Sequence, residues 1–208
     1  MVVARDTVGM EHPPTRRSPG VSAARAVLLL VAVMWAIELV DALLPLTLDR
    51  LGITGRTATG LLGIPAAPLL HVGFGHLLAN TVPFVVLGLL VAWRSRDRFW
   101  GVLGIIVLLG GLGVWLFTSP GTVTLGASGV LFGFAAYLVT AGLITRHWVD
   151  VVVAVGVVAV YGTMLTGVLP FAVPPGVSWL GHLTGAIAGV TAAMLLARRP
   201  AATPAPGG

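Results

Sequence analysis

The chain contains no cysteine and no lysine, and it has few charged residues of any kind. Among its 208 residues there are 12 basic residues, all arginine, and 7 acidic residues, so that charged residues make up only 9%. The absence of cysteine excludes disulfide bonds, a thiolate nucleophile and cysteine-ligated metal sites. A soluble domain carries about 25% charged residues. A chain with 9% charged and 57% hydrophobic residues is therefore predicted to be embedded in a lipid bilayer.

Six apolar segments are long enough to cross a bilayer, which takes about 20 residues. They cover residues 26–46, 74–93, 100–118, 127–145, 149–169 and 178–197. The longest connection between them, about 47–73, is the first loop. The sequence thus predicts an all-α polytopic membrane protein whose membrane domain spans residues 25–198. A polar cytoplasmic segment (1–24) precedes this domain, and a disordered cytoplasmic tail (199–208) follows it.

The arginines are distributed unevenly between the two sides of the predicted membrane. With the N-terminus inside, ten arginines fall in cytoplasmic segments and two, Arg50 and Arg56, fall outside in the first loop. Cytoplasmic loops carry an excess of basic residues, so both termini are predicted to be cytoplasmic. The expected location is a bacterial plasma membrane, with which the lack of a recognisable targeting segment is compatible. The same distribution explains the net charge of +5 without a nucleic-acid partner.

Polar residues interrupt three of the apolar segments, and with this orientation all of them lie near the outer face. They are His76 and Asn80 in the second segment, Ser128 at the start of the fourth, and His182 early in the sixth. Polar groups are costly in lipid and tend to be functional there. A serine that attacks a carbonyl, a histidine that accepts its proton and donors for the resulting oxyanion are the components of a serine hydrolase.

The base, His182, has no carboxylate predicted nearby, which favours a Ser-His dyad over a triad. Phe132 lies one turn after Ser128 on the same helical face, and it can stack on the imidazole if the fourth and sixth helices touch. Small-residue stripes that begin at Gly129 and Gly181 permit such close contact. Each polar residue taken singly is more often an interhelical hydrogen-bond partner, so it is their common depth that favours a site.

Three short motifs occur in a fixed order along nearly the whole membrane domain. They read His71-x4-His76-x3-Asn80, Gly126-x-Ser128-Gly129 and Gly181-His182-x2-Gly185-x3-Gly189. In this combination, on a six-helix core of about residues 26–197, the chain resembles the rhomboid intramembrane serine proteases. The resemblance implies a rhomboid-like six-helix bundle that cleaves transmembrane segments of other membrane proteins through an acyl-enzyme. It implies no cofactor and no metal, and it leaves the oligomeric state open.

The resemblance also implies a role for each matching residue. Ser128 matches the family's nucleophile and His182 its base. His76, Asn80 and the backbone N–H of Ser128 match its oxyanion hole.

Other matching positions have supporting roles. Phe132 takes the place of an aromatic residue, often tyrosine, that stacks on the base, and His71 matches a histidine just outside the second helix. Gly126 and Gly129 flank the nucleophile. The chain departs from the family in its first loop, where many members carry a Trp-Arg pair and this sequence has no tryptophan.

Other functions are weighed against this one. A metal-dependent protease could use His71, His76 and His182, but the His-Glu-x-x-His pattern and a nearby carboxylate are missing. A transporter or channel would fit six helices, but the sequence has no inverted repeat. A non-catalytic relative that binds transmembrane clients has the same fold and usually lacks the serine or the histidine, both of which are present here.

Two carboxylates near the outer end of the first helix, Glu38 and Asp41, match no motif. Each could pair with a loop arginine, Arg50 or Arg56, or could simply be solvated at the membrane interface. Solvation is the favoured interpretation for Asp41.

Overall fold

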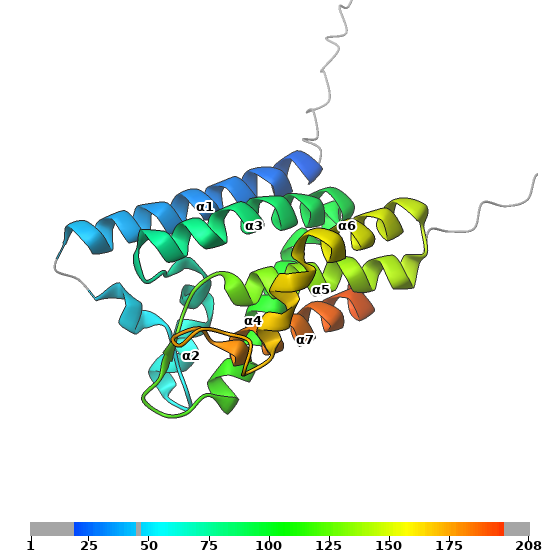
Figure 1. The fold of residues 1–208 in the computed structure, drawn as a ribbon. Helices are drawn as coiled ribbons and strands as arrows, with labels where there is room; N and C mark the ends of the chain where they lie inside the picture. Colours follow the sequence, from blue (N-terminus) through cyan, green and yellow to red (C-terminus); the bar gives the residue numbers. More distant parts are fainter. Residues whose placement is uncertain (1–18, 45–46, 198–208) are drawn as a thin grey trace, which may run out of the picture.

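The computed structural model describes residues 19–44 and 47–197 (Figure 1). Most of the predicted N-terminal segment and all of the predicted tail lie outside the described residues. The described chain is an all-α bundle with six helices long and apolar enough to cross a membrane, so the predicted fold class is confirmed.

The six long helices are α1 (Pro19–Leu43), α3 (Gly73–Arg94), α4 (Phe99–Phe117), α5 (Ser128–Thr145), α6 (Trp148–Leu165) and α7 (Trp179–Leu196). The connection between α1 and α3 contains η1 (Leu48–Leu51), β1 (Ile53–Thr54), α2 (Ala58–Ala66) and η2 (Ala67–Leu69). Three further short elements are η3 (Arg96–Arg98), β2 (Val123–Thr124) and η4 (Thr166–Val168).

The helix ends differ from the predicted segments where proline or local packing decides the boundary. α1 begins at Pro19, seven residues before the predicted start, because proline is well suited to the first position of a helix. It ends at Leu43 rather than at residue 46. Pro45 follows in the sequence, and a proline disfavours helical geometry at the residue before it. α6 ends at Leu165 and is followed by the tighter η4, which ends at Val168, two residues before Pro170.

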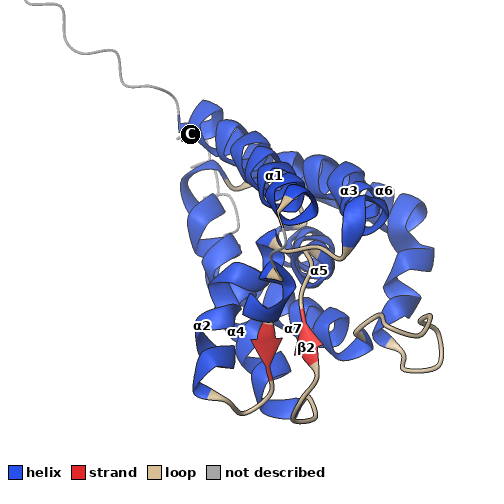
Figure 2. Cartoon of the chain, turned by 90° about the vertical axis from the view of Figure 1, so that its left-hand side faces the viewer, coloured by secondary structure: helices blue, strands red, loops and turns tan. Residues whose placement is uncertain are grey.

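Helix α5 lies at the centre of the bundle and is seen nearly end-on in Figure 2, with α3, α4, α6 and α7 packed against it or beside it. Of its residues, 56% are buried inside the protein, the largest share among the six long helices. The corresponding share for α6 is 11%. The first residue of α5, Ser128, is therefore held by the most enclosed helix of the molecule.

Helices α5 and α7 approach each other so closely that their contact positions have no room for a side chain. A Cβ atom on Gly185 would lie 2.1 Å from the carbonyl oxygen of Gly129, and one on Gly189 would lie 2.0 Å from that of Gly133. Small residues on facing helices permit this backbone contact. The predicted contact between the fourth and sixth apolar segments is thus present in the fold.

The first connection is structured, although the sequence predicted only a loop. Strand β1 pairs antiparallel with β2, with Ile53 opposite Thr124 and Thr54 opposite Val123. α2 packs against α4, as Figure 2 shows. The pairing ties the first connection to the segment that leads into α5, so both contribute to the surroundings of Ser128.

The carboxylates of α1 do not pair with a loop arginine, so that interpretation is wrong for both. The one ion pair within the described ranges joins Arg94 and Asp150. Asp41 accepts a hydrogen bond from the backbone N–H of Leu48 at 2.9 Å, so it fixes the start of η1 and is not merely solvated. Glu38 is buried, with 5% of its surface exposed.

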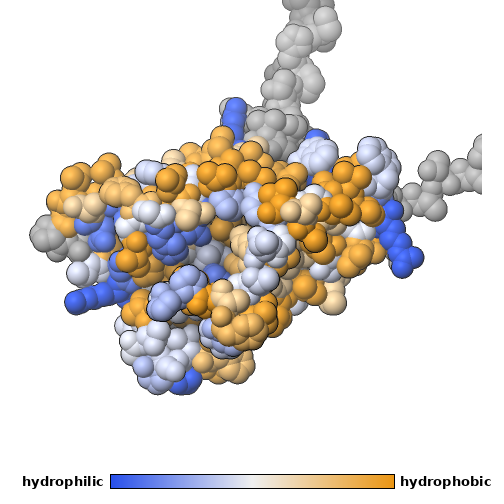
Figure 3. Space-filling view, in the orientation of Figure 1, coloured by the Kyte–Doolittle hydropathy of each residue, from blue (hydrophilic) through white to orange (hydrophobic). Residues whose placement is uncertain are grey.

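The surface reflects the membrane composition of the chain. Figure 3 shows apolar side chains over the flanks of the long helices, with hydrophilic side chains gathered toward the end that carries the first connection and toward the opposite end. Large exposed apolar residues occur on every long helix, as expected for helices that face lipid tails.

Candidate active site

Ser128 and His182 are in hydrogen-bond contact. The Ser128 Oγ atom lies 3.0 Å from Nε2 of His182, a buried residue in the first turn of α7. The close approach of α5 and α7 brings these residues together from positions 54 apart in the sequence. Ser178 caps α7, its Oγ accepting a hydrogen bond from the N–H of Gly181 at 3.1 Å, and so fixes where the helix carrying His182 begins.

The other nitrogen of the imidazole is held by a backbone carbonyl. Nδ1 of His182 lies 3.0 Å from the carbonyl oxygen of Gly167 in η4. Because a carbonyl can only accept a hydrogen bond, Nδ1 carries the hydrogen, and Nε2 is left as the acceptor for the Ser128 hydroxyl. A carbonyl thus holds the His182 imidazole at the position where a triad would have a carboxylate.

Gly167 is a residue of the candidate site that the sequence analysis missed. A Cβ atom there would lie 3.2 Å from Nδ1 of His182 and 3.0 Å from Cζ of Phe132, so a side chain would press on both rings. Every residue has a backbone carbonyl, so the residue type at position 167 does not show that its carbonyl accepts this hydrogen bond. The one available signal was a glycine close before Pro170, at a point where the apolar segment ends.

Phe132 stacks on the His182 imidazole, as predicted from the helical spacing. Its ring centroid lies 4.1 Å from that of His182, and the two rings are nearly parallel, with an interplanar angle of 7°. The Phe132 side chain, on α5, is buried inside the protein. The phenyl ring and the Gly167 carbonyl together fix the plane and the rotation of the imidazole.

His76 and Asn80 lie on α3, and His76 contacts the loop that precedes Ser128. His76 lines the same cavity as Ser128. Its ring leaves no room for a side chain on Gly126, whose Cβ would lie 2.8 Å from Cε1 and whose φ of +110° also favours glycine. Asn80 is buried one turn further along α3 and donates from Nδ2 to the backbone carbonyl of His76 at 2.8 Å.

His71 supports the loop that precedes Ser128. It is 2% exposed, and its Nε2 accepts a hydrogen bond from the N–H of Ala127 at 3.4 Å. Its ring meets that of His76 edge-on, with centroids 5.2 Å apart. Burial and the neighbouring His76 lower the pKa of His71 to about 4, against a smaller opposite effect of the Leu69 backbone. His71 is therefore neutral at ordinary pH, as an acceptor must be.

This pKa makes the stability contribution of His71 dependent on pH. Above about pH 6.5 the residue is neutral in both folded and unfolded chains, and below it only the unfolded chain gains a proton. The wild type is expected to lose about 3 kcal/mol of unfolding free energy through His71 as the pH falls from 6.5 to about 4. Thermal unfolding in detergent at each pH measures this, with His71→Gln as the control. An identical pH profile for that variant would contradict the assignment.

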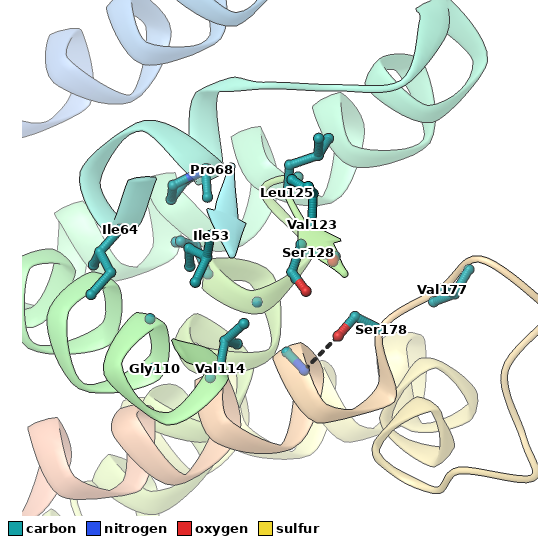
Figure 4. Close-up of a pocket in the computed structure, with 18 of the residues that line it drawn as sticks. Ile53, Ile64, Pro68, Gly110, Val114, Val123, Leu125, Ser128, Val177 and Ser178 are labelled. Carbon is teal, nitrogen blue, oxygen red and sulfur yellow. Dashed lines mark hydrogen bonds between the residues drawn. The ribbon is translucent and has the colours of Figure 1, made fainter. Parts of the chain in front are cut away.

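A cavity of about 550 Å³ opens beside Ser128. Figure 4 shows the Ser128 hydroxyl directed into it, with Ser178 on the far side. Its walls come from β1, α2, α4, β2 and the segment before α7, and they are mainly apolar. The volume falls within the range of cavities that bind small molecules or short polymer segments.

His71, His76 and His182, which a metal-dependent protease could use as ligands, do not assemble into a metal site. No group of three or more histidine, cysteine or acidic side chains able to hold an ion occurs in residues 19–44 and 47–197. His71 and His76 lie together, whereas His182 faces Ser128 and Gly167.

Comparison with known proteins adds an independent observation. A family model described as the Rhomboid domain matches residues 56–199. The chain is 43% identical over 188 residues to an uncharacterized protein of Mycobacterium tuberculosis (strain ATCC 25618 / H37Rv), covering 88% of this chain and 78% of the relative. It is 40% identical over 176 residues to an uncharacterized protein of Mycobacterium leprae (strain TN), covering 82% of this chain and 70% of that relative.

Proposed function

The chain belongs to the rhomboid family and is an integral, multi-pass membrane protein, and from this premise we propose that it is an intramembrane serine endopeptidase. The observation that carries the proposal is the 3.0 Å contact between Ser128 Oγ and His182 Nε2 at the wall of a large cavity. A serine and a histidine in this relation form an activated nucleophile. The substrates proposed are transmembrane segments of other membrane proteins.

In the first step, Ser128 Oγ attacks the carbonyl carbon of the substrate peptide bond while His182 Nε2 takes the hydroxyl proton. The Gly167 carbonyl, which accepts from Nδ1, stabilises the imidazolium that forms. The imidazolium then donates its proton to the leaving amine, which produces an acyl-enzyme on Ser128. A water molecule, deprotonated by the same imidazole, releases the acyl product and restores the serine.

Negative charge on the substrate oxygen is proposed to be stabilised by His76, Asn80 and the backbone N–H of Ser128. The place of His76 in the cavity wall supports this assignment. An asparagine amide has two N–H donors, and the bond to the His76 carbonyl uses one. The other is available once a substrate is bound.

Substrate access to Ser128 depends on the conformation of the substrate segment and on the orientation of the protease in the membrane. A helical substrate segment has its amides hydrogen-bonded internally, so we propose that it unwinds near one end before it enters the cavity. Both termini of the protease are proposed to be cytoplasmic, as the arginine distribution favours. The site then lies near the outer face of a bacterial plasma membrane.

The test is reconstitution of the purified protein in liposomes with a single-span protein substrate. Cleavage within or beside the span, retained in the presence of a metal chelator, is the expected result. Cleavage that a chelator abolishes would indicate a metal-dependent protease instead. Stable capture of the substrate without cleavage, by a protein shown to be folded, would indicate the non-catalytic client-binding relative.

Asn80→Ala is expected to lower the rate of cleavage about 100-fold, because loss of one oxyanion donor typically costs about 10²–10³ in rate. The substrate concentration at half-maximal rate should change little, since the interaction strengthens in the transition state. Thr81→Val is the matched control: Thr81 is the next residue on α3, but its hydroxyl bonds to Trp35 and the Leu77 carbonyl. Equal rates for Asn80→Ala and the wild type would remove Asn80 from the mechanism.

A further inference from the structure

A second cavity, lined mainly by polar groups, lies at the other end of the bundle. It has a volume of about 190 Å³ and is lined by residues at the end of α3, in η3, in the last turns of α5 and at the start of α6. Its main polar lining residues are Arg94, Ser95, Arg98, Tyr137, His147 and Asp150. Along α5, at 1.5 Å per residue, the lining residues Tyr137 to Thr145 lie about 14–26 Å from Ser128. The cavity therefore has no part in the proposed protease chemistry.

The single carboxylate in this cavity is already neutralised. Oδ1 of Asp150 accepts from Nε of Arg94 at 2.6 Å, and Oδ2 accepts from the Thr145 hydroxyl at 2.9 Å. Each of its oxygens thus has a partner within the protein. The acidic group orients Arg94 and leaves the second guanidinium, that of Arg98, without an opposing charge in the cavity.

Hydrogen-bond donors in the cavity exceed their acceptors. Arg98 uses Nη1 to bond the Leu196 carbonyl at 2.6 Å, and Arg94 uses Nε, whereas each guanidinium carries five N–H donors. Ser95 and Tyr137 place two hydroxyls 2.5 Å apart, which share one hydrogen between them and leave the other to donate. Nδ1 of His147 is buried and has no hydrogen-bond partner among the residues that the structure describes. The lining side chains carry one positive charge, that of Arg98, that no carboxylate in the cavity balances, and their unused donors outnumber their unused acceptors.

We propose that this cavity binds a phosphate group. Guanidinium groups match the oxygens of phosphate in geometry and charge. The Ser95 and Tyr137 hydroxyls leave one hydrogen free to donate, and Nδ1 of His147 donates in the tautomer that carries its hydrogen there. A small anion of this kind supplies the acceptors and the negative charge that the cavity lacks. A chloride ion would supply a single acceptor atom for these donors, whereas a phosphate group supplies several oxygens.

The neighbouring residues indicate an anionic phospholipid as the source of the phosphate. Exposed tryptophans adjoin three of the cavity residues in the sequence: Trp93 beside Arg94, Trp100 close after Arg98, and Trp148 beside His147. Tryptophans gather at the depth of the lipid headgroups, so the cavity opens where phospholipid phosphates lie. Inorganic phosphate shares the chemistry and is distinguished by experiment.

The test compares two arginine variants that remove the same charge from η3. Arg98 lines the cavity and Arg96, two residues earlier, does not. Purified full-length protein in detergent micelles is titrated with phosphatidylglycerol or phosphatidylcholine, and bound lipid is counted by native mass spectrometry. Arg98→Gln is expected to lower phosphatidylglycerol affinity about tenfold, because charge-assisted hydrogen bonds are lost. Arg96→Gln should bind as the wild type does.

A second variant and a competition with inorganic phosphate distinguish the remaining outcomes. Tyr137→Phe, which removes one donor and no charge, should weaken binding less than Arg98→Gln, and it replaces that variant if Arg98→Gln fails to fold. Displacement of the lipid by millimolar inorganic phosphate supports the phosphate site but assigns it to free phosphate. Equal losses in Arg96→Gln and Arg98→Gln, or no preference for phosphatidylglycerol over phosphatidylcholine, would overturn the proposal.

Discussion

Replacing Ser128 by alanine is expected to lower the cleavage of a reconstituted transmembrane substrate by about 10⁴-fold or more, to below detection. The variant removes the only atom that can form the acyl-enzyme in the proposed mechanism, and removal of the nucleophile in a serine protease leaves only the small contribution of the oxyanion site and binding. Initial rates measured in liposomes at equal protein loading give the comparison. Site-specific cleavage retained by Ser128→Ala would exclude the mechanism.

The matched control is a second serine in the same cavity wall. Ser178 faces the cavity across from Ser128 but bonds the N–H of Gly181 as the cap of α7. Ser178→Ala should cost about 1 kcal/mol of stability through loss of the cap. It should keep most of the activity at temperatures where the protein is folded. A loss as large as that of Ser128→Ala would mean that the two serines had been assigned the wrong roles.

Replacing Gly185 by alanine is expected to destabilise the protein by about 2 kcal/mol or more and to inactivate it. The added Cβ would lie 2.1 Å from the carbonyl oxygen of Gly129, a backbone atom that cannot move without shifting α5. Such a shift separates Ser128 from His182, and a displacement of about 1 Å can cost 100-fold in rate. Thermal unfolding in detergent and the cleavage rate together measure both effects.

Gly104→Ala on α4 is the control for this substitution. No atom lies within 4 Å of the Cβ that it would introduce. Alanine favours a helix over glycine by about 1 kcal/mol, so this variant should be as stable as the wild type or more stable, with unchanged activity. Equal behaviour of Gly104→Ala and Gly185→Ala would show that the close contact of α5 and α7 is not needed.

The membrane helices could be predicted from the sequence because each depends on its own composition. Twenty apolar residues between polar or proline-containing breaks identify a spanning helix without knowledge of its neighbours. The largest error in a helix boundary was the start of α1, where Pro19 begins the helix within a polar stretch. Composition gives little signal there, because an end outside the bilayer core need not be apolar.

The first connection could not be predicted because its structure depends on distant partners. Strands β1 and β2 are two residues long each and pair across about seventy residues of sequence. The short helix α2 contains Pro65, which argues against a helix when read locally. Its packing on α4 and the pairing of the strands stabilise a conformation that neither segment signals alone.

The candidate site was predictable to the extent that it consists of side chains. The spacing of Phe132 from Ser128 predicted the stacking on His182, since residues four apart share a helical face. The role of the Gly167 carbonyl was not predictable, because every residue has a backbone carbonyl and the residue type does not show which one bonds the imidazole. Similarly, the hydrogen bond from Ala127 to His71 could not be predicted without knowing how η2 approaches the loop before α5.

In the proposed mechanism, the stacked Phe132 ring and the Gly167 carbonyl hold His182 in place without a third charged residue. The carbonyl accepts the hydrogen bond from Nδ1 and adds no charge to the site.

Labelling with a fluorophosphonate probe tests the central claim most directly. The probe reacts only with a serine activated by a base, and mass spectrometry of the digested protein identifies the modified residue. The account predicts a single label on Ser128 in the wild type and in Ser178→Ala, and none in His182→Ala. Absence of label on a wild-type protein shown to be folded, or labelling that persists in His182→Ala, would contradict an activated Ser-His dyad.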